Sequence, residues 1–230
     1  MKKVLKAVIL SVMVLSLSLL AAGQASSSSL NEQLITAAKS GDTAAVQQLL
    51  QQGANVNAKD NNGMTALLEA AYTGNVDIAR LLVEKGANLD AYNRDGLTAL
   101  LFAGRQGHIG VVKLLLENGA NTNVKDDNGY TALMFAAVNG DVGVLNLLID
   151  KGADLEAKNN NGNTALMMSA TAAHHIEVVR ALIKAGANVN TKDAQGYSVL
   201  WVTQNIIPED AAEASRRKEF SDSLKQAGAR

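Results

Sequence analysis

The three histidines are the first candidates in this sequence for metal binding or catalysis. His174 and His175 are adjacent, and the only other histidine is His108. A metal site needs three or four converging ligands, whereas neighbours at the start of a helix point about 100° apart. The chain has no cysteine, no His-x-x-x-His spacing and no Gly-x-Ser-x-Gly sequence. The sequence therefore predicts no catalytic site, no metal and no cofactor, and it does not predict an enzyme.

The first 25 residues have the layout of a secretory signal peptide. Lys2, Lys3 and Lys6 precede an uncharged apolar run over residues 7–22, and small residues follow up to Ala25. We expect cleavage after Ala25. The run of 16 residues is shorter than the roughly 18 that a membrane span usually needs. An uncleaved membrane anchor over residues 7–22 is the alternative.

The charge of the remaining chain argues against nucleic acid as a partner. Without the three N-terminal lysines, 18 basic and 22 acidic side chains remain, a formal net charge of −4. Contacts to a phosphate backbone need clustered lysine and arginine. The absence of cysteine also excludes disulfides, so packing alone must hold the fold together.

Two short sequences recur in fixed phase through most of the chain. Gly-x-Thr-Ala-Leu begins at Gly63, Gly96, Gly129 and Gly162, at steps of 33, and Gly-Tyr-Ser-Val-Leu follows at Gly196 after 34. The second series is Gly-Ala-Asn or Gly-Ala-Asp, and it begins at Gly53, Gly86, Gly119, Gly152 and Gly186. A fixed period of this length is typical of a repeat protein.

Each unit can be interpreted as a turn followed by two helices. Asn-Gly and Asp-Gly pairs favour tight turns, and the threonine after each pair is a helix N-cap. The first helix should end at a glycine such as Gly74, where a left-handed conformation is favourable, and Asn75 can cap the second helix. His108 and His175 occupy the same N-cap position in later units. His174 replaces the glycine in a loop that is one residue longer, so capping is the role that we predict for these histidines.

The repeating unit resembles the ankyrin repeat, a 33-residue β-turn plus two helices with the signature Thr-Pro-Leu-His-x-Ala. The resemblance covers about residues 30–230. The proline and the histidine of the signature are absent, because these units have Thr-Ala-Leu-Leu or Thr-Ala-Leu-Met. The histidine position should instead carry apolar packing, from Leu68, Leu101, Met134, Met167 and Trp201.

The resemblance implies an all-α solenoid of stacked helix-turn-helix units with β-turn tips. About six repeats are expected, including two caps. We divide the chain into the signal peptide (1–25) and one ankyrin repeat domain (26–230). Within that domain, the N-terminal cap covers 30–60, the full repeats 61–193 and an extended C-terminal cap 194–230.

In the family layout, the first helices and turn tips form a concave binding face. We predict that this face binds a partner protein, with no catalysis. The predicted contact residues are Met64, Tyr72, Arg94, Leu97, Arg105, Asp127, Tyr130, Val138, Asn163 and Tyr197, with Asp95 and Asn128 beside them at the tips. Some of these side chains could instead only cover the neighbouring repeat, since single exposed apolar residues are common.

The resemblance to bacterial ankyrin proteins with cleavable signals favours the periplasm, and a periplasmic enzyme as the partner. We expect a monomer that meets the membrane only during export. Two alternatives remain open: a membrane-anchored scaffold that keeps residues 7–22, and a secreted effector that binds a host protein.

Overall fold

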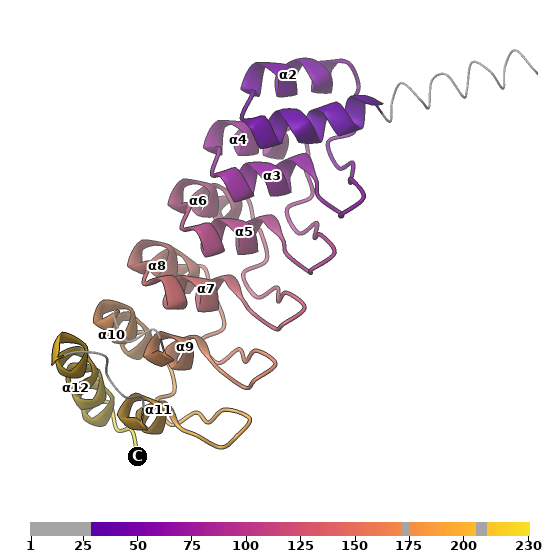
Figure 1. Cartoon of the computed structure of the whole chain (residues 1–230). Coiled ribbons are helices and arrows are strands. Elements are labelled where there is room, and N and C mark those ends of the chain that lie inside the picture. The colour runs from indigo at the N-terminus through magenta and orange to yellow at the C-terminus, as the bar shows by residue number, and fades with distance from the viewer. Residues whose placement is uncertain (1–28, 172–174, 206–210) are drawn as a thin grey trace, which may run out of the picture.

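The computed structural model describes residues 29–171, 175–205 and 211–230. These residues form six helix pairs, stacked in chain order (Figure 1). The first pair is the helix over residues 29–40 with α2 (Thr43–Gln51). The other pairs are α3 (Ala66–Thr73) with α4 (Val76–Glu84), α5 (Ala99–Gln106) with α6 (Ile109–Glu117), α7 (Ala132–Asn139) with α8 (Val142–Asp150), α9 (Ala165–Thr171) with α10 (Ile176–Lys184), and α11 (Val199–Asn205) with α12 (Ala211–Gln226).

The pairs stack so that first helices contact first helices and second helices contact second helices. α3, α5, α7, α9 and α11 form one row, and α2, α4, α6, α8, α10 and α12 form the other (Figure 1). Hairpin loops project to one side from the row of first helices. This arrangement confirms the predicted all-α solenoid, in which each unit buries its apolar residues against its neighbours.

Threonine caps and left-handed glycines define the first helices as predicted. The hydroxyls of Thr65, Thr98 and Thr131 accept hydrogen bonds from backbone N–H groups in the first turn of α3, α5 and α7. Gly74, at the end of α3, has a φ of +74°. Asn75 then caps α4 by accepting from the N–H of Ile78. These caps satisfy backbone groups that would otherwise lack a partner.

Each hairpin is organised by an aspartate or asparagine three residues before the turn glycine. The Asp60 carboxylate accepts from the N–H groups of Asn62 and Met64, both at 2.8 Å. The equivalent residues Asn93, Asp126, Asn159 and Asp193 make the same two contacts. The turns were predicted from their glycines, and local backbone hydrogen bonds were the expected role of a turn aspartate such as Asp126.

Polar contacts also tie each repeat to the next. The Lys59 ammonium donates to the backbone carbonyl of Tyr92 at 2.7 Å, one repeat further on. Lys125 and Lys158 donate in the same way to the carbonyls of Lys158 and Lys192. Because these bonds repeat along the stack, they fix neighbouring hairpins relative to one another.

The apolar replacement of the signature histidine is confirmed at four positions and wrong at the fifth. Leu68, Leu101, Met134 and Met167 are almost fully buried. Trp201 is 44% exposed and stacks on Tyr197, with ring centroids 3.8 Å apart. The difference arises because each of the four is covered by the next first helix, whereas none of the described helices lies beyond α11 in that row.

The predicted signal peptide, residues 1–25, and the alternative anchor over residues 7–22 lie outside the described residues. Within the described ranges, no helix is both long enough and apolar enough to cross a membrane.

Candidate protein-binding surface

The histidines link neighbouring repeats and do not cap helices by their side chains. Neither His108 nor His175 makes a side-chain capping bond, so that part of the prediction is wrong. Instead, His108 Nε2 donates to the Tyr72 carbonyl at the end of α3, at 3.1 Å. The ring lies over Gly74, where an added Cβ would be 2.6 Å from His108 Nδ1, and His175 lies over Gly140 in the same way. Each histidine side chain reaches back to the preceding repeat because the glycine there, Gly74 or Gly140, leaves room for the imidazole ring.

His174 lies outside the described residues. Across the part of the chain that is described, no three histidine, aspartate or glutamate side chains come together as metal ligands.

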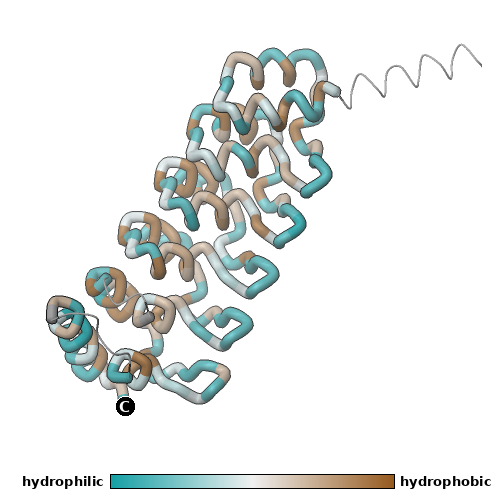
Figure 2. Tube along the Cα trace, viewed as in Figure 1, coloured by the Kyte–Doolittle hydropathy of each residue, from teal (hydrophilic) through white to brown (hydrophobic). Residues whose placement is uncertain are grey.

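The first helices and the hairpins form the surface that we call the inner surface, which corresponds to the concave face of the family layout. The hairpin tips are hydrophilic in every repeat (Figure 2). On the helices, a residue two positions before the terminal glycine lies beside the next first helix. Tyr72 meets Phe102 edge to face at 5.7 Å between ring centroids, and Arg105 lies 5.7 Å from the centre of the Phe135 ring.

Three predicted contact residues share this position on the first helices. Tyr72 is 48% exposed, and Arg105 is also exposed. Val138 is half-buried. Tyr72 and Arg105 are therefore open to a partner while an aromatic neighbour restricts their side chains.

The residues after the turn glycines differ in exposure. Tyr197 is 41% exposed, while Met64, Tyr130 and Asn163 are half-buried. Tyr130 stacks on Phe135, with ring centroids 5.3 Å apart. Leu97 is only 6% exposed and belongs to the hydrophobic core, so its prediction as a contact residue is wrong. Its side chain packs within the repeat stack, in line with the alternative that some of these side chains only cover the neighbouring repeat.

Both predicted contact residues at the tips, Arg94 and Asp127, are exposed, as are Asp95 and Asn128 beside them. Their backbones link successive hairpins, because Arg94 N–H donates to the Asn62 carbonyl at 3.0 Å and Asp127 N–H donates to the Asp95 carbonyl at 3.2 Å. The backbone bonds fix the tips, and both side chains remain open to solvent.

Sequence reasoning missed two aromatic residues of the inner surface, Phe135 and Trp201, and the buried Phe102 that packs against Tyr72. Phe102 and Phe135 occupy equivalent places six residues after a turn glycine. Their 33-residue spacing was a usable signal. Trp201 was assigned to buried packing, and only the end of the helix row exposes it.

In a comparison with protein families, residues 34–126 and 118–193 match a family model described as ankyrin repeats (3 copies). The chain belongs to the ankyrin-repeat family. No curated protein matches it. Ankyrin repeats indicate a protein–protein interaction module, and ankyrin proteins are generally non-catalytic.

One carboxylate is buried in the inner surface of the ankyrin stack. Glu69 is 6% exposed in α3, where later repeats have Phe102 and Phe135. Burial raises the pKa of its carboxyl, Lys39 partly offsets this increase, and Asp60 adds to it. Lys39 stands two residues before Gly41, the same place as Tyr72 before Gly74. This end of the ankyrin inner surface therefore places a buried carboxylate within the electrostatic influence of Lys39.

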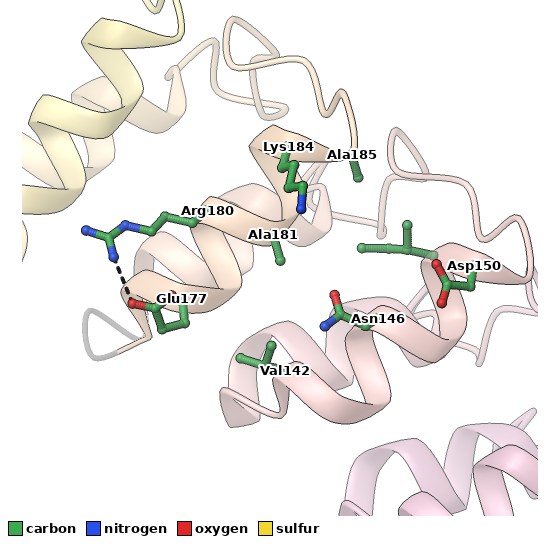
Figure 3. Close-up of a pocket in the computed structure, with 9 residues that line it drawn as sticks. Val142, Asn146, Asp150, Glu177, Arg180, Ala181, Lys184 and Ala185 are labelled. Atoms are coloured by element: carbon green, nitrogen blue, oxygen red, sulfur yellow. Dashed lines mark hydrogen bonds and ion pairs between the residues drawn. The ribbon is translucent and has the colours of Figure 1, made fainter.

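The outer row of the ankyrin stack has a groove of about 430 Å³ between α8 and α10 (Figure 3). Its apolar residues include Val142 and Ala181, and its charged residues are of both signs. Arg180 donates to Glu177 at 2.9 Å and to Glu219 of α12 at 2.6 Å. These contacts give the groove a structural role, since its arginine joins the last helix to the stack.

Proposed function

We propose that this ankyrin protein binds a partner protein through its inner surface, without catalysis. The distribution of exposed apolar side chains supports this proposal. Among the described residues, the large apolar side chains that are exposed are Tyr72, Tyr92, Ile109, Tyr197 and Trp201. Four of these five lie on first helices or hairpins, and all four are tyrosine or tryptophan, which are enriched among residues that dominate binding energy.

The binding mechanism would be rigid shape complementarity. The lysine contacts and the backbone bonds between hairpins connect neighbouring hairpins before any partner arrives. Tyr72 and Tyr130 are already held by Phe102 and Phe135. Little conformational entropy is then lost on binding, and this increases affinity.

A matched pair of variants tests the surface. Tyr72 and Ile109 are 48% and 50% exposed, but Ile109 lies in the outer row. After the partner is isolated with the tagged wild-type protein, Tyr72→Ala with Tyr197→Ala should weaken binding roughly tenfold or more. Ile109→Ala should leave the affinity unchanged. A loss with Ile109→Ala, and none with the double variant, would contradict the proposal.

We also propose that residues 1–25 direct export to the periplasm and are removed there, and that the partner is a periplasmic enzyme bound by a monomer. The charged start and apolar run of the sequence support export. The intact mass of the protein from periplasmic extract tests the proposal, because cleavage after Ala25 removes the whole apolar run. A mass that retains residues 7–22 would favour the anchored scaffold, and recovery from the culture medium would favour a secreted effector.

A further inference from the structure

The first helices from α3 to α11 contain one exposed charged side chain. Among the residues of α3, α5, α7, α9 and α11, only Glu69 and Arg105 carry a charge. Glu69 is buried, whereas the Arg105 side chain is exposed. The helices that line the surface from α3 to α11 therefore present a single exposed charged group, with apolar and uncharged side chains around it.

Arg105 is held in place without an acidic partner. Its guanidinium carbon lies 5.7 Å from the centre of the Phe135 ring, and Phe135 in turn stacks on Tyr130. Its backbone carbonyl accepts from the Asn139 amide of the next repeat at 2.7 Å. No ion pair joins Arg105 to a carboxylate of the described residues. The N–H groups of the guanidinium thus remain available to a ligand.

This arrangement favours a carboxylate ligand. A guanidinium presents N–H donors in a planar fork that matches both oxygens of a carboxylate, and an aromatic contact restricts its orientation before binding. Tyr72 lies on the neighbouring helix α3, 48% exposed, and offers an apolar contact beside the charge. A single arginine suits one carboxylate, whereas a nucleic-acid backbone needs clustered cations.

We infer that the inner surface recognises a segment of a partner protein that carries an aspartate or glutamate flanked by apolar residues. Arg105 pairs with the carboxylate, and the apolar residues pack on Tyr72 and Tyr130. This inference rests on the proposed function, because it names the chemistry of the partner at the same surface.

The test uses the purified protein and a display library of random 12-residue peptides. Peptides selected on the wild-type protein should be enriched in aspartate or glutamate next to apolar residues, and their affinity should fall as salt concentration rises. Arg105→Gln should weaken their binding roughly tenfold or more, and Arg105→Lys should weaken it less. Arg105→Glu should select peptides rich in lysine or arginine.

The control is Arg80→Gln, because Arg80 is an exposed arginine on α4 in the outer row and its loss changes the net charge equally. This variant should bind the selected peptides as the wild type does. Two results would overturn the inference and leave the proposed surface intact. The selected peptides could lack carboxylates, or they could bind Arg105→Gln normally and lose affinity only with Tyr72→Ala. Peptides that bind both variants normally but lose affinity with Ile109→Asp would overturn the inference and the proposed surface together.

Discussion

Replacing Gly74 by alanine should weaken the junction between two repeats by two separable effects. Gly74 has a φ of +74°, which side-chain-bearing residues rarely adopt. The added Cβ would also lie 2.6 Å from Nδ1 of His108. The imidazole would have to move, and its hydrogen bond to the Tyr72 carbonyl would be lost.

The expected loss can be divided between these effects. A left-handed alanine costs about 1–2 kcal/mol relative to glycine. The lost hydrogen bond adds about 1 kcal/mol, so Gly74→Ala should lower the free energy of unfolding by about 2–3 kcal/mol. Gly86→Ala is the matched control, because Gly86 has a φ of +83° and no atom within 4 Å of the added Cβ. It should lose only the backbone cost of about 1–2 kcal/mol.

Urea-induced unfolding followed by far-ultraviolet circular dichroism measures these values. A second pair of variants in a His108→Ala background isolates the ring, because Gly74→Ala then meets no imidazole. In that background Gly74→Ala and Gly86→Ala should cost the same. An equal cost for the two glycines in the wild-type background, or a difference that persists without His108, would refute the assigned role of the histidine.

Three further results are expected from other parts of the structure. Thr131→Ala removes the N-cap of α7 and should lower the free energy of unfolding by about 1 kcal/mol in urea denaturation, and no loss would contradict the capping role. Burial raises the pKa of Glu69, so ionisation of its carboxyl should destabilise the fold as pH rises above about 4.3, the ordinary pKa of glutamate. In thermal unfolding, Glu69→Gln should therefore be more stable than the wild type at pH 7. The difference should vanish at pH 3. Arg180→Ala breaks the half-exposed ion pair with Glu219 that joins α12 to α10, a contact worth about 0.2–1 kcal/mol. Amide hydrogen exchange of α12, measured by mass spectrometry, should become up to about fivefold faster, and the exchange of α3 should stay unchanged.

The repeating glycines and threonines predict most of the fold, because each specifies its own local geometry. Thr65 caps a helix and Gly74 ends it through contacts within a few residues. The direction in which a side chain points between repeats cannot be predicted from such local contacts. His108 could cap α6 or reach back, and the outcome depends on the Tyr72 carbonyl 36 residues earlier.

The same reason limits what could be predicted for the candidate surface. Leu97 and Tyr197 follow equivalent turn glycines, yet one is in the core and the other is 41% exposed. Exposure depends on the neighbouring repeat, and Tyr197 belongs to the last hairpin of the stack. Arg105 and Tyr72, which were predicted as contact residues, are exposed, and their contact with a partner stays a prediction.

Photocrosslinking in intact cells tests most directly whether the inner surface binds a partner protein. A photoreactive side chain would replace Tyr72 in one strain and Ile109 in another, since the two side chains are almost equally exposed but lie in different helix rows. We predict one dominant crosslinked protein from position 72 and none of it from position 109. The same products from both positions, or the dominant product from position 109 alone, would contradict the proposed binding surface.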